Sequence, residues 1–201
     1  MTVDIRAVPL TVAGVRLEPL VEAHREGLRA AGDDPAIWAH MPMAATGPAF
    51  DVWFDGSLKV VHTGAEAVWA VRTLEDDRLV GSTRYLAIVA EHRRVEIGHT
   101  WYAQGAWAGV VNPACKFALL RYAFEVLALN RVELKTDIRN VRSQGAMAKL
   151  GAIREGVFRA HMIRPDGSLR DSVYFAITRD DWPRVRDGLT ARLGLTIEET
   201  I

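Results

Sequence analysis

The chain has 201 residues, of which 49% are hydrophobic, enough for one domain with a substantial core. Its 25 basic and 25 acidic residues cancel, which argues against a partner attracted by net charge, such as nucleic acid or an anionic membrane. Cys115 is the only cysteine, which excludes an internal disulfide and suits a reducing compartment. The chain shows no signal-peptide pattern and no bilayer-length apolar stretch, so we expect a soluble, cytoplasmic protein without membrane contact.

Hydrophobic periodicity and breaker residues predict a single series of elements without repeats or low-complexity linkers. In chain order we expect a strand at 14–20, a helix at 22–32, two helices within 34–64, strands at 67–73, 78–89 and 94–103, a helix at 112–127, a strand at 131–138, a helix at 140–150, strands at 154–163 and 168–178 joined by an RPDG turn, and a helix at about 179–195. This order predicts one domain over residues 1–201 with an α+β (mixed α/β) fold, a mostly antiparallel sheet and helices on its faces.

The stretch GAWAGVVNPACK, residues 105–116, predicts an unusual helix start. Asn112 and Pro113 are typical of an N-cap and a first-turn proline, yet no acidic residue occurs from 104 to 124. Free N–H groups at a helix start favour an anion, and Lys116 could add a positive charge. The pattern therefore indicates a phosphate site, the alternative being a plain capped helix whose Lys116 extends to water.

A second helix start repeats this pattern. Asn140 follows a predicted strand and precedes Val141, Arg142 and Ser143, again without an acid in the first turn. Arg139 adds a further positive charge. If the two preceding strands are neighbours, both helix starts present bare N–H groups to one cleft, which would suit a long polyanionic ligand.

The order of these elements resembles a known family. The segments VEIGHTWYAQGAWAGVVNPACKFALLRYAFEVLALNRVELKTDIRNVRSQGAMAKLGAIREGVF and MIRPDGSLRDSVYFAITRDDW, with RLEPL near the start, resemble the GNAT superfamily of N-acetyltransferases. Within it they are similar to the branch of ribosomal-protein N-terminal-alanine and N-terminal-serine acetyltransferases. The resemblance implies a twisted sheet of about seven strands, splayed between the fourth and fifth.

The resemblance also implies acetyl-CoA as the donor substrate, with no metal. Trp101 and Tyr102 would lie beside the pantetheine arm, Asn140 would contact it, and Ser143 would lie near the thioester sulfur. The implied pyrophosphate site comprises the loop and helix start: Ala108, Gly109, Val110, Val111 and Asn112, with Lys116 near.

The chain departs from the family pattern at two places. The usual glycine-rich Gln/Arg-x-x-Gly-x-Gly/Ala loop is replaced by WAGVVNPACK, which changes the expected phosphate contacts. Met147 stands where many relatives carry a tyrosine that protonates the leaving thiolate, so Ser143 is the nearest substitute. The missing tyrosine leaves a second hypothesis open, a non-catalytic acyl-CoA-binding module.

Acetyl transfer to an amine needs the two reactants held together and help in removing a proton. An α-amino group with a pKa near 8 is about one-tenth neutral at pH 7, so an α-amine acceptor needs little help from a catalytic base. Glu96 and Glu155 are candidate bases, acting directly or through water. The alternative for each is a salt-bridge partner, and for Ser143 a hydrogen bond within its own helix.

Four further residues are candidates for the acceptor site: Trp38, Trp69, Arg84 and His99. The helical region at 34–64 would form part of that site, and the alternative for its aromatic residues is core packing. Arg84 could bind an acceptor carboxylate or be a solvated strand arginine, and His99 could line the site or be a partly buried strand histidine.

Other activities lack their motifs. No HExxH or Cys/His cluster indicates a metal, and no GxxxxGK[ST] or GxGxxG indicates a nucleotide. Arginines between 131 and 170 alternate with acids, so nucleic-acid binding is the weakest hypothesis. The acceptor stays open between a protein N-terminus and a small-molecule amine, and a homodimer is expected by analogy only.

Overall fold

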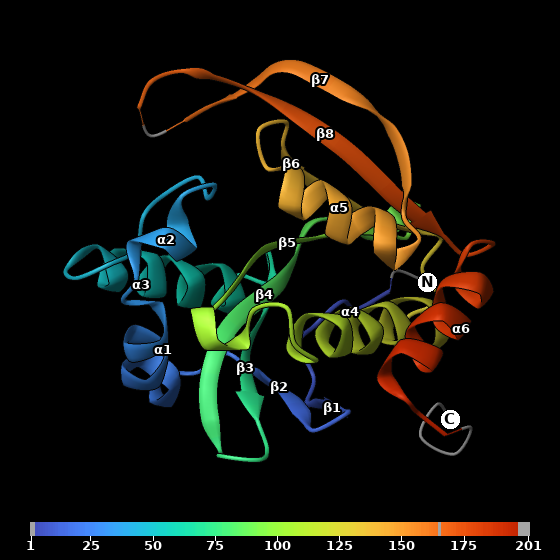
Figure 1. Cartoon of the computed structure of the whole chain (residues 1–201), viewed down its shortest axis with the longest axis horizontal. Helices are drawn as coiled ribbons and strands as arrows, with labels where there is room; N and C mark the ends of the chain where they lie inside the picture. The colour runs from blue at the N-terminus through green and yellow to red at the C-terminus, as the bar shows by residue number, and fades with distance from the viewer. Residues whose placement is uncertain (1–2, 165, 197–201) are drawn as a thin grey trace.

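The computed structural model of the protein describes residues 3–164 and 166–196. Within them, eight strands form one sheet in the order β1-β2-β3-β4-β5-β6-β8-β7 (Figure 1). The strands are β1 (Leu10–Val12), β2 (Val15–Pro19), β3 (Ala67–Thr73), β4 (Arg78–Val89), β5 (Arg94–Tyr102), β6 (Arg131–Asp137), β7 (Ile153–Ile163) and β8 (Leu169–Thr178). Neighbouring strands are antiparallel except β5 and β6, which are parallel. The predicted mixed α/β fold with a mostly antiparallel sheet is therefore confirmed.

Helices cover both faces of the sheet. They are α1 (Arg25–Gly32), α2 (Pro35–Trp38), α3 (Ala49–His62), α4 (Val111–Arg121), α5 (Val141–Leu150) and α6 (Trp182–Leu193). Successive side chains of a strand point to opposite faces, so β3 is buried from both sides. Trp69 joins a core with Phe117 of α4 and Trp182 of α6. Val68 joins a second core with Phe50 of α3.

The sheet has one strand more than predicted. Leu10–Val12 pairs with Val15–Leu17 through a two-residue turn in which Ala13 and Gly14 both have positive φ, 47° and 73°. Such turns match the twist of a hairpin, but an Ala-Gly pair is a weak signal for one. Two helices do form within 34–64, and α6 lies within the expected 179–195.

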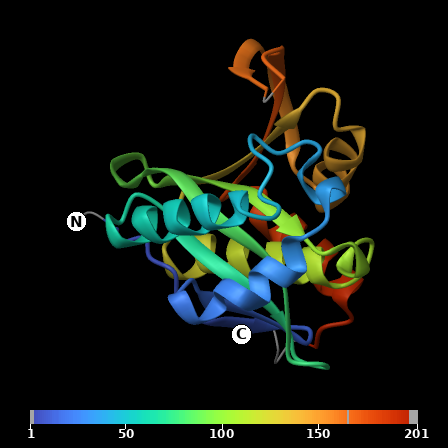
Figure 2. The same ribbon diagram turned by 90° about the vertical axis from the view of Figure 1, so that its left-hand side faces the viewer.

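The β7–β8 hairpin rises from the body of the molecule and bends over one face of the sheet (Figures 1 and 2). Its register shifts between Arg154 and Gly156 and between Phe158 and Met162, as expected where a strand bends. Pro165 of the predicted RPDG turn lies outside the described residues. In the two described ranges, no helix could cross a membrane and no three metal-binding side chains gather.

Candidate active site

The parallel strands β5 and β6 pair over only three residues. Arg94, Val95 and Glu96 face residues 131–133, and the register ends there although both strands continue. Residues 97–102 of β5 therefore have no partner on β6 in the described sheet. The Tyr102 carbonyl accepts from Trp107 Nε1 at 2.8 Å, and the other backbone polar groups on that edge are left for another partner. This is the predicted splay between the fourth and fifth expected strands.

A bulge in β5 marks the splay. Between Arg84–Gly98 and Ser82–Trp101, the single residue Thr83 of β4 faces His99 and Thr100. His99 has φ 45°, a left-handed conformation that is unusual for a non-glycine residue and fits a bulge. Burial, together with the positive charges of Arg84, Lys135 and Arg170, lowers the pKa of His99 to about 4. The imidazole is therefore neutral at pH 7.

The start of α4 exposes unpaired N–H groups. The helix begins at Val111 with Val110 as its cap, so the prediction that Asn112 is the N-cap is wrong. Ala108 has φ 59°, which turns the loop into the helix. Within the described part of the chain, the amides of 108–112 meet no acceptor, and residues 108–110 are exposed. This is the arrangement that binds phosphate at helix starts.

Lys116 does not lie at this exposed edge. Its side chain is 8% exposed, and Nζ donates to Thr100 Oγ1 of β5 at 3.3 Å. Burial lowers the pKa of this amine to about 8. The alternative that Lys116 extends to water is wrong, and its charge lies inside the splay instead of beside the free N–H groups.

The start of α5 is largely capped, although the sequence predicted bare N–H groups at both helix starts. In its first turn, the Arg142 N–H meets no acceptor among the described residues. Asn140 Oδ1 accepts the Ser143 N–H at 3.0 Å, and the Val141 N–H donates to the Arg139 carbonyl at 3.1 Å. Asp137 Oδ1 accepts the Arg139 N–H at 2.9 Å. Here the asparagine precedes the helix and caps it.

The two helix starts nevertheless lie side by side. The guanidinium carbon of Arg142, in the first turn of α5, lies 4.2 Å from the centre of the Trp107 ring, in the loop before α4. This cation–π contact joins the two segments that the sequence predicted to share one cleft. Ser143 is half-buried one turn into α5, and its hydroxyl has no partner among the described residues.

The face of the splay that points away from α4 carries charged side chains. Glu96 is buried and accepts from Lys135 Nζ at 2.8 Å, and burial raises its pKa. Tyr174 of β8 pairs with Lys135 and shares a hydrogen bond of 3.3 Å with His161 Nε2. Glu96 thus lies in a polar layer with Lys135 of β6 and Tyr174 of β8. The raised pKa of its carboxyl favours proton exchange there.

Glu155 is not part of this layer. Both of its oxygens accept from the Arg131 guanidinium, which lowers its pKa. Arg131 lies at the paired end of β5 and β6, away from the splay. The prediction of Glu155 as a base is therefore wrong, and its salt-bridge alternative is correct.

The three tryptophans predicted for the site, Trp38, Trp69 and Trp101, all pack in the core. Trp69 is fully buried on the α4 side, and its Nε1 donates to the Val8 carbonyl at 2.7 Å, so its assignment to the acceptor site is wrong. Trp38 packs against Trp53 and Trp101 on the α1–α3 side. The ring of Trp101 is thereby packed in this aromatic cluster, and its buried Nε1 has no hydrogen-bond partner among the described residues.

Arg84 and Tyr102 are also buried. Arg84 donates to Glu66 Oε2 at 2.8 Å and to Ser57 Oγ at 2.8 Å, so it is neither a solvated arginine nor free for a carboxylate. Tyr102 lies in the core on the α4 side. Of the predicted acceptor residues, only His99 lies in the splay with its functional atoms uncommitted to another group.

The sequence analysis did not find several polar and charged residues of the polar layer: Lys135, Asp137, His161, Arg164, Arg170 and Tyr174. The one available signal was the alternation of charged and apolar residues over 131–138. In the structure, Asp137 and Arg170 are both buried.

Comparisons with known proteins agree with this geometry. Residues 15–153 match the family described as "Acetyltransferase (GNAT) domain". The chain is 29% identical over 109 residues to the "Putative ribosomal N-acetyltransferase YdaF" of Bacillus subtilis strain 168, a match covering 54% of this chain and 58% of that protein. The chain thus spans little more than half the length of that relative.

Solved structures match over nearly the whole chain. A GCN5-related N-acetyltransferase from Brucella melitensis has 25% identity and a TM-score of 0.88, covering 98% of this chain and 90% of that one. Mycobacterium smegmatis RimJ, in complex with CoA-disulfide, shares the fold at 22% identity and a TM-score of 0.78, covering 96% and 97%. Since the family model alone covers well over half of its residues, this chain belongs to the GNAT acetyltransferases.

Proposed function

We propose that the protein is an acetyl-CoA-dependent N-acetyltransferase, acting as one domain, that moves the acetyl group to a primary amine by direct attack in a ternary complex. The observation that carries this proposal is the row of unpaired N–H groups at 108–112 beside the unpaired edge of β5. The first suits a pyrophosphate and the second suits the amides of a pantetheine arm. The crystallised complex of RimJ with CoA-disulfide supports the same use of this fold.

Residues along the splay would hold successive parts of the donor substrate, from its phosphates to its thioester. Backbone N–H groups of Ala108, Gly109, Val110, Val111 and Asn112 bind the phosphates. The backbone at Trp101 and Tyr102 pairs with the arm, and the Asn140 amide nitrogen donates to it, because only its oxygen is used in the cap. Ser143, whose hydroxyl is uncommitted, lies where the thioester end arrives.

Positioning supplies most of the rate, since a thioester is already activated. The amine nitrogen attacks the carbonyl carbon, the C–S bond breaks, and nitrogen loses one proton. Glu96 accepts that proton through water, and its raised pKa keeps it suited to exchange near neutral pH. The Ser143 hydroxyl donates a hydrogen bond to the leaving thiolate, in place of the tyrosine that Met147 replaces.

The proposal also covers the chemical class of the acceptor amine. The similarity to a protein named as a ribosomal N-acetyltransferase favours a protein N-terminal α-amine, and a small-molecule amine is the alternative. Met147 favours a second candidate function, a non-catalytic acyl-CoA-binding module, because it cannot donate a proton to the thiolate.

Calorimetric titration with coenzyme A, followed by thiol release from acetyl-CoA over a panel of amines, tests both functions. The panel includes peptides with N-terminal alanine or serine, an amino sugar and a polyamine. We expect binding heat and thiol release with at least one amine. Binding without turnover for any amine would identify the binding module, and absence of binding heat would reject both.

A further inference from the structure

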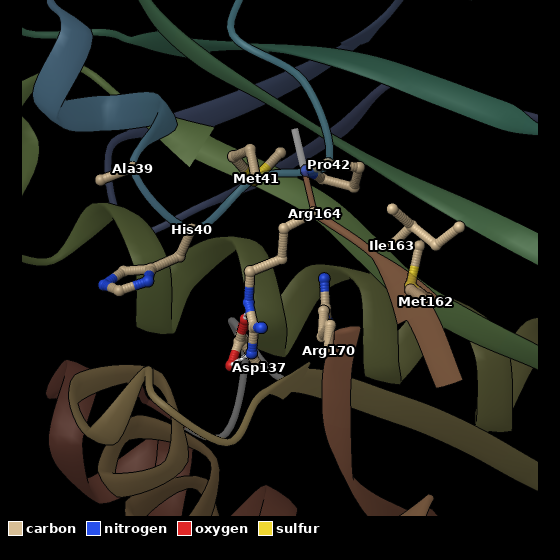
Figure 3. Close-up of a pocket in the computed structure, with 9 residues that line it drawn as sticks. All are labelled: Ala39, His40, Met41, Pro42, Asp137, Met162, Ile163, Arg164 and Arg170. Carbon is tan, nitrogen blue, oxygen red and sulfur yellow. Dashed lines mark hydrogen bonds and ion pairs between the residues drawn. The ribbon is translucent and has the colours of Figure 1, made fainter. Parts of the chain in front are cut away.

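A small pocket lies on the polar side of the splay, between the segment after α2 and the turn end of the β7–β8 hairpin (Figure 3). It is lined by Ala39, His40, Met41, Pro42, Asp137, Met162, Ile163, Arg164 and Arg170. The core side of β6 and β8 carries Leu134 and Val173, so Asp137 and Arg170 project from the opposite face. The pocket therefore opens away from α4.

One of the two arginines in this pocket is fully engaged. Arg164 Nε donates to Asp137 Oδ2 at 2.6 Å and Arg164 Nη2 donates to Asp137 Oδ1 at 2.9 Å. Asp137 Oδ1 also accepts the Arg139 N–H. The Arg164 guanidinium lowers the pKa of Asp137 to about 2, so this carboxylate stays ionised and already has its partner.

The other arginine is not engaged. Arg170 is only 8% exposed, and among the described residues its side chain has neither an ion pair nor a hydrogen bond. Its Nε is sealed from solvent without an acceptor, so only the two Nη groups are left to face the pocket they line. Figure 3 shows Arg164 meeting Asp137 while Arg170 stands apart. A buried guanidinium stays charged and is costly without a partner.

The neighbouring carboxylates cannot satisfy Arg170. Asp137 and Glu96 are the acids that attract it, and they are held by Arg164 and Lys135 respectively. The pocket therefore holds two guanidinium groups but only one carboxylate, which Arg164 occupies. The positive charge of Arg170 is left for an external anion. The fixed, forked geometry of a guanidinium matches a carboxylate.

Arg170 lies on β8, the strand whose Tyr174 pairs with Lys135, and Lys135 Nζ donates to Glu96 in the splay at 2.8 Å. The charge of Arg170 acts on Glu96 and on His99 in the β5 bulge. Resting on the acetyl transfer proposed above, we infer that the acceptor amine belongs to a molecule that also carries a carboxylate, and that the Nη groups of Arg170 bind this carboxylate. The carboxylate belongs either to a small amino-acid-like amine or to an acidic residue near a protein N-terminus.

Matched acceptor pairs test this inference. Glutamic acid α-amide against glutaminamide, and the peptide amides Ala-Glu-Ala against Ala-Gln-Ala, differ in a carboxylate but present similar α-amines. For wild type we expect kcat/KM to favour the acid by about tenfold to a hundredfold, the range of a charge-assisted pair. Preference within the first pair indicates a small molecule, and preference within the second indicates a protein N-terminus.

Arg170→Met should bring the acid-to-amide ratio of kcat/KM to about one, mainly by raising KM for the acid. Arg159→Met, an exposed arginine on the same hairpin, is the matched control and should keep the wild-type ratio. Arg170→Met should melt no lower than wild type, because it removes an unpaired buried charge. If it does not fold, Arg170→Lys, which loses the fork, should lower the ratio several-fold.

Equal rates on acid and amide in wild type, or a preference that survives in Arg170→Met, would overturn the carboxylate site and leave acetyl transfer standing. Absence of thiol release with every amine would instead reject acetyl transfer itself, and the inference with it.

Discussion

The starts of α4 and α5 are alike in sequence and opposite in structure. Each follows a strand, contains an asparagine, lacks acids in its first turn and has a cation nearby. At α4 the N–H groups of 108–112 are free, whereas at α5 Asn140 caps Ser143. The difference is the position of the asparagine. Asn112 is the second residue inside its helix and cannot cap it, while Asn140 stands one residue before its helix.

This comparison shows that an acid-free helix start is not by itself an anion site. What distinguishes the two is whether a nearby side chain already satisfies the N–H groups. The start of α4 is open because Val110 is its cap, and a valine side chain offers no acceptor. In the proposed function, α4 therefore binds the phosphates, and α5 orients the arm and thioester.

Gly109→Asp should give the largest effect. A Cβ at this position meets only the Ala106 carbonyl oxygen, at 3.8 Å, so the change is sterically tolerated. The new carboxylate would compete for the free N–H groups and repel phosphate, and should weaken coenzyme A binding by about a hundredfold, equivalent to about 3 kcal/mol. Calorimetry measures this. Gly109→Asn, which is similar in size and uncharged, should change affinity much less; equal losses would show that the site is not electrostatic.

Lys116→Met tests whether the α4 lysine is buried as the structure shows. The pKa of Lys116 is about 8 in the fold against a usual 10.5, so the unfolded chain binds more protons between those values. The free energy of unfolding should therefore rise with pH across this window, by up to about 3 kcal/mol from this group. The variant should be more stable at pH 7 and lack this rise in denaturant titrations. An unchanged slope, like that expected for exposed Lys149→Met, would place Lys116 in water.

Asn140→Ala and Asn112→Ala test the two asparagines directly. Loss of the Asn140 cap should cost about 1 kcal/mol of unfolding free energy. Asn112 makes no side-chain hydrogen bond within the described residues, so its replacement should change stability by less than about 0.5 kcal/mol. Urea unfolding measures both. Asn140→Ser, which can still cap, should recover most of the loss, and equal effects at the two sites would contradict the assignment.

Arg142→Ala should have a modest effect, because it removes one exposed cation–π contact. We expect the free energy of unfolding to fall by about 0.5–1 kcal/mol and coenzyme A affinity to fall a few-fold, because the loop at Trp107 is no longer held by its contact with Arg142. A double-mutant cycle with Trp107→Leu measures the coupling. Strict additivity of the two changes would show that the helix starts are not joined by this contact.

Much of the fold could be predicted because its signals are local. Alternation identified the strand at 131–138, and Gly151, which has φ 92°, ends α5 where a glycine was expected. The errors have local causes too. Strand β1 is three residues long and turns at an Ala-Gly pair, and Val110 gives no capping signal that would place the start of α4 before Asn112.

The candidate site was predicted less completely, because partners distant in the chain determine it. Nothing near Glu155 in the sequence indicates that Arg131 will hold it, and nothing near Arg84 indicates Glu66. Trp69 lies on a strand buried from both sides, so alternation could not identify the core it joins.

The sequence by itself determined the order of elements, the family and the absence of acids from 104 to 124, because each depends on residues close together in the chain. Only the tertiary structure decided which helix start is open, where Lys116 points and which charges are left unpaired. Those outcomes depend on burial and on hydrogen bonds between distant segments, such as Asp137 with Arg164, which leaves Arg170 without a partner in the part of the chain that the structure describes.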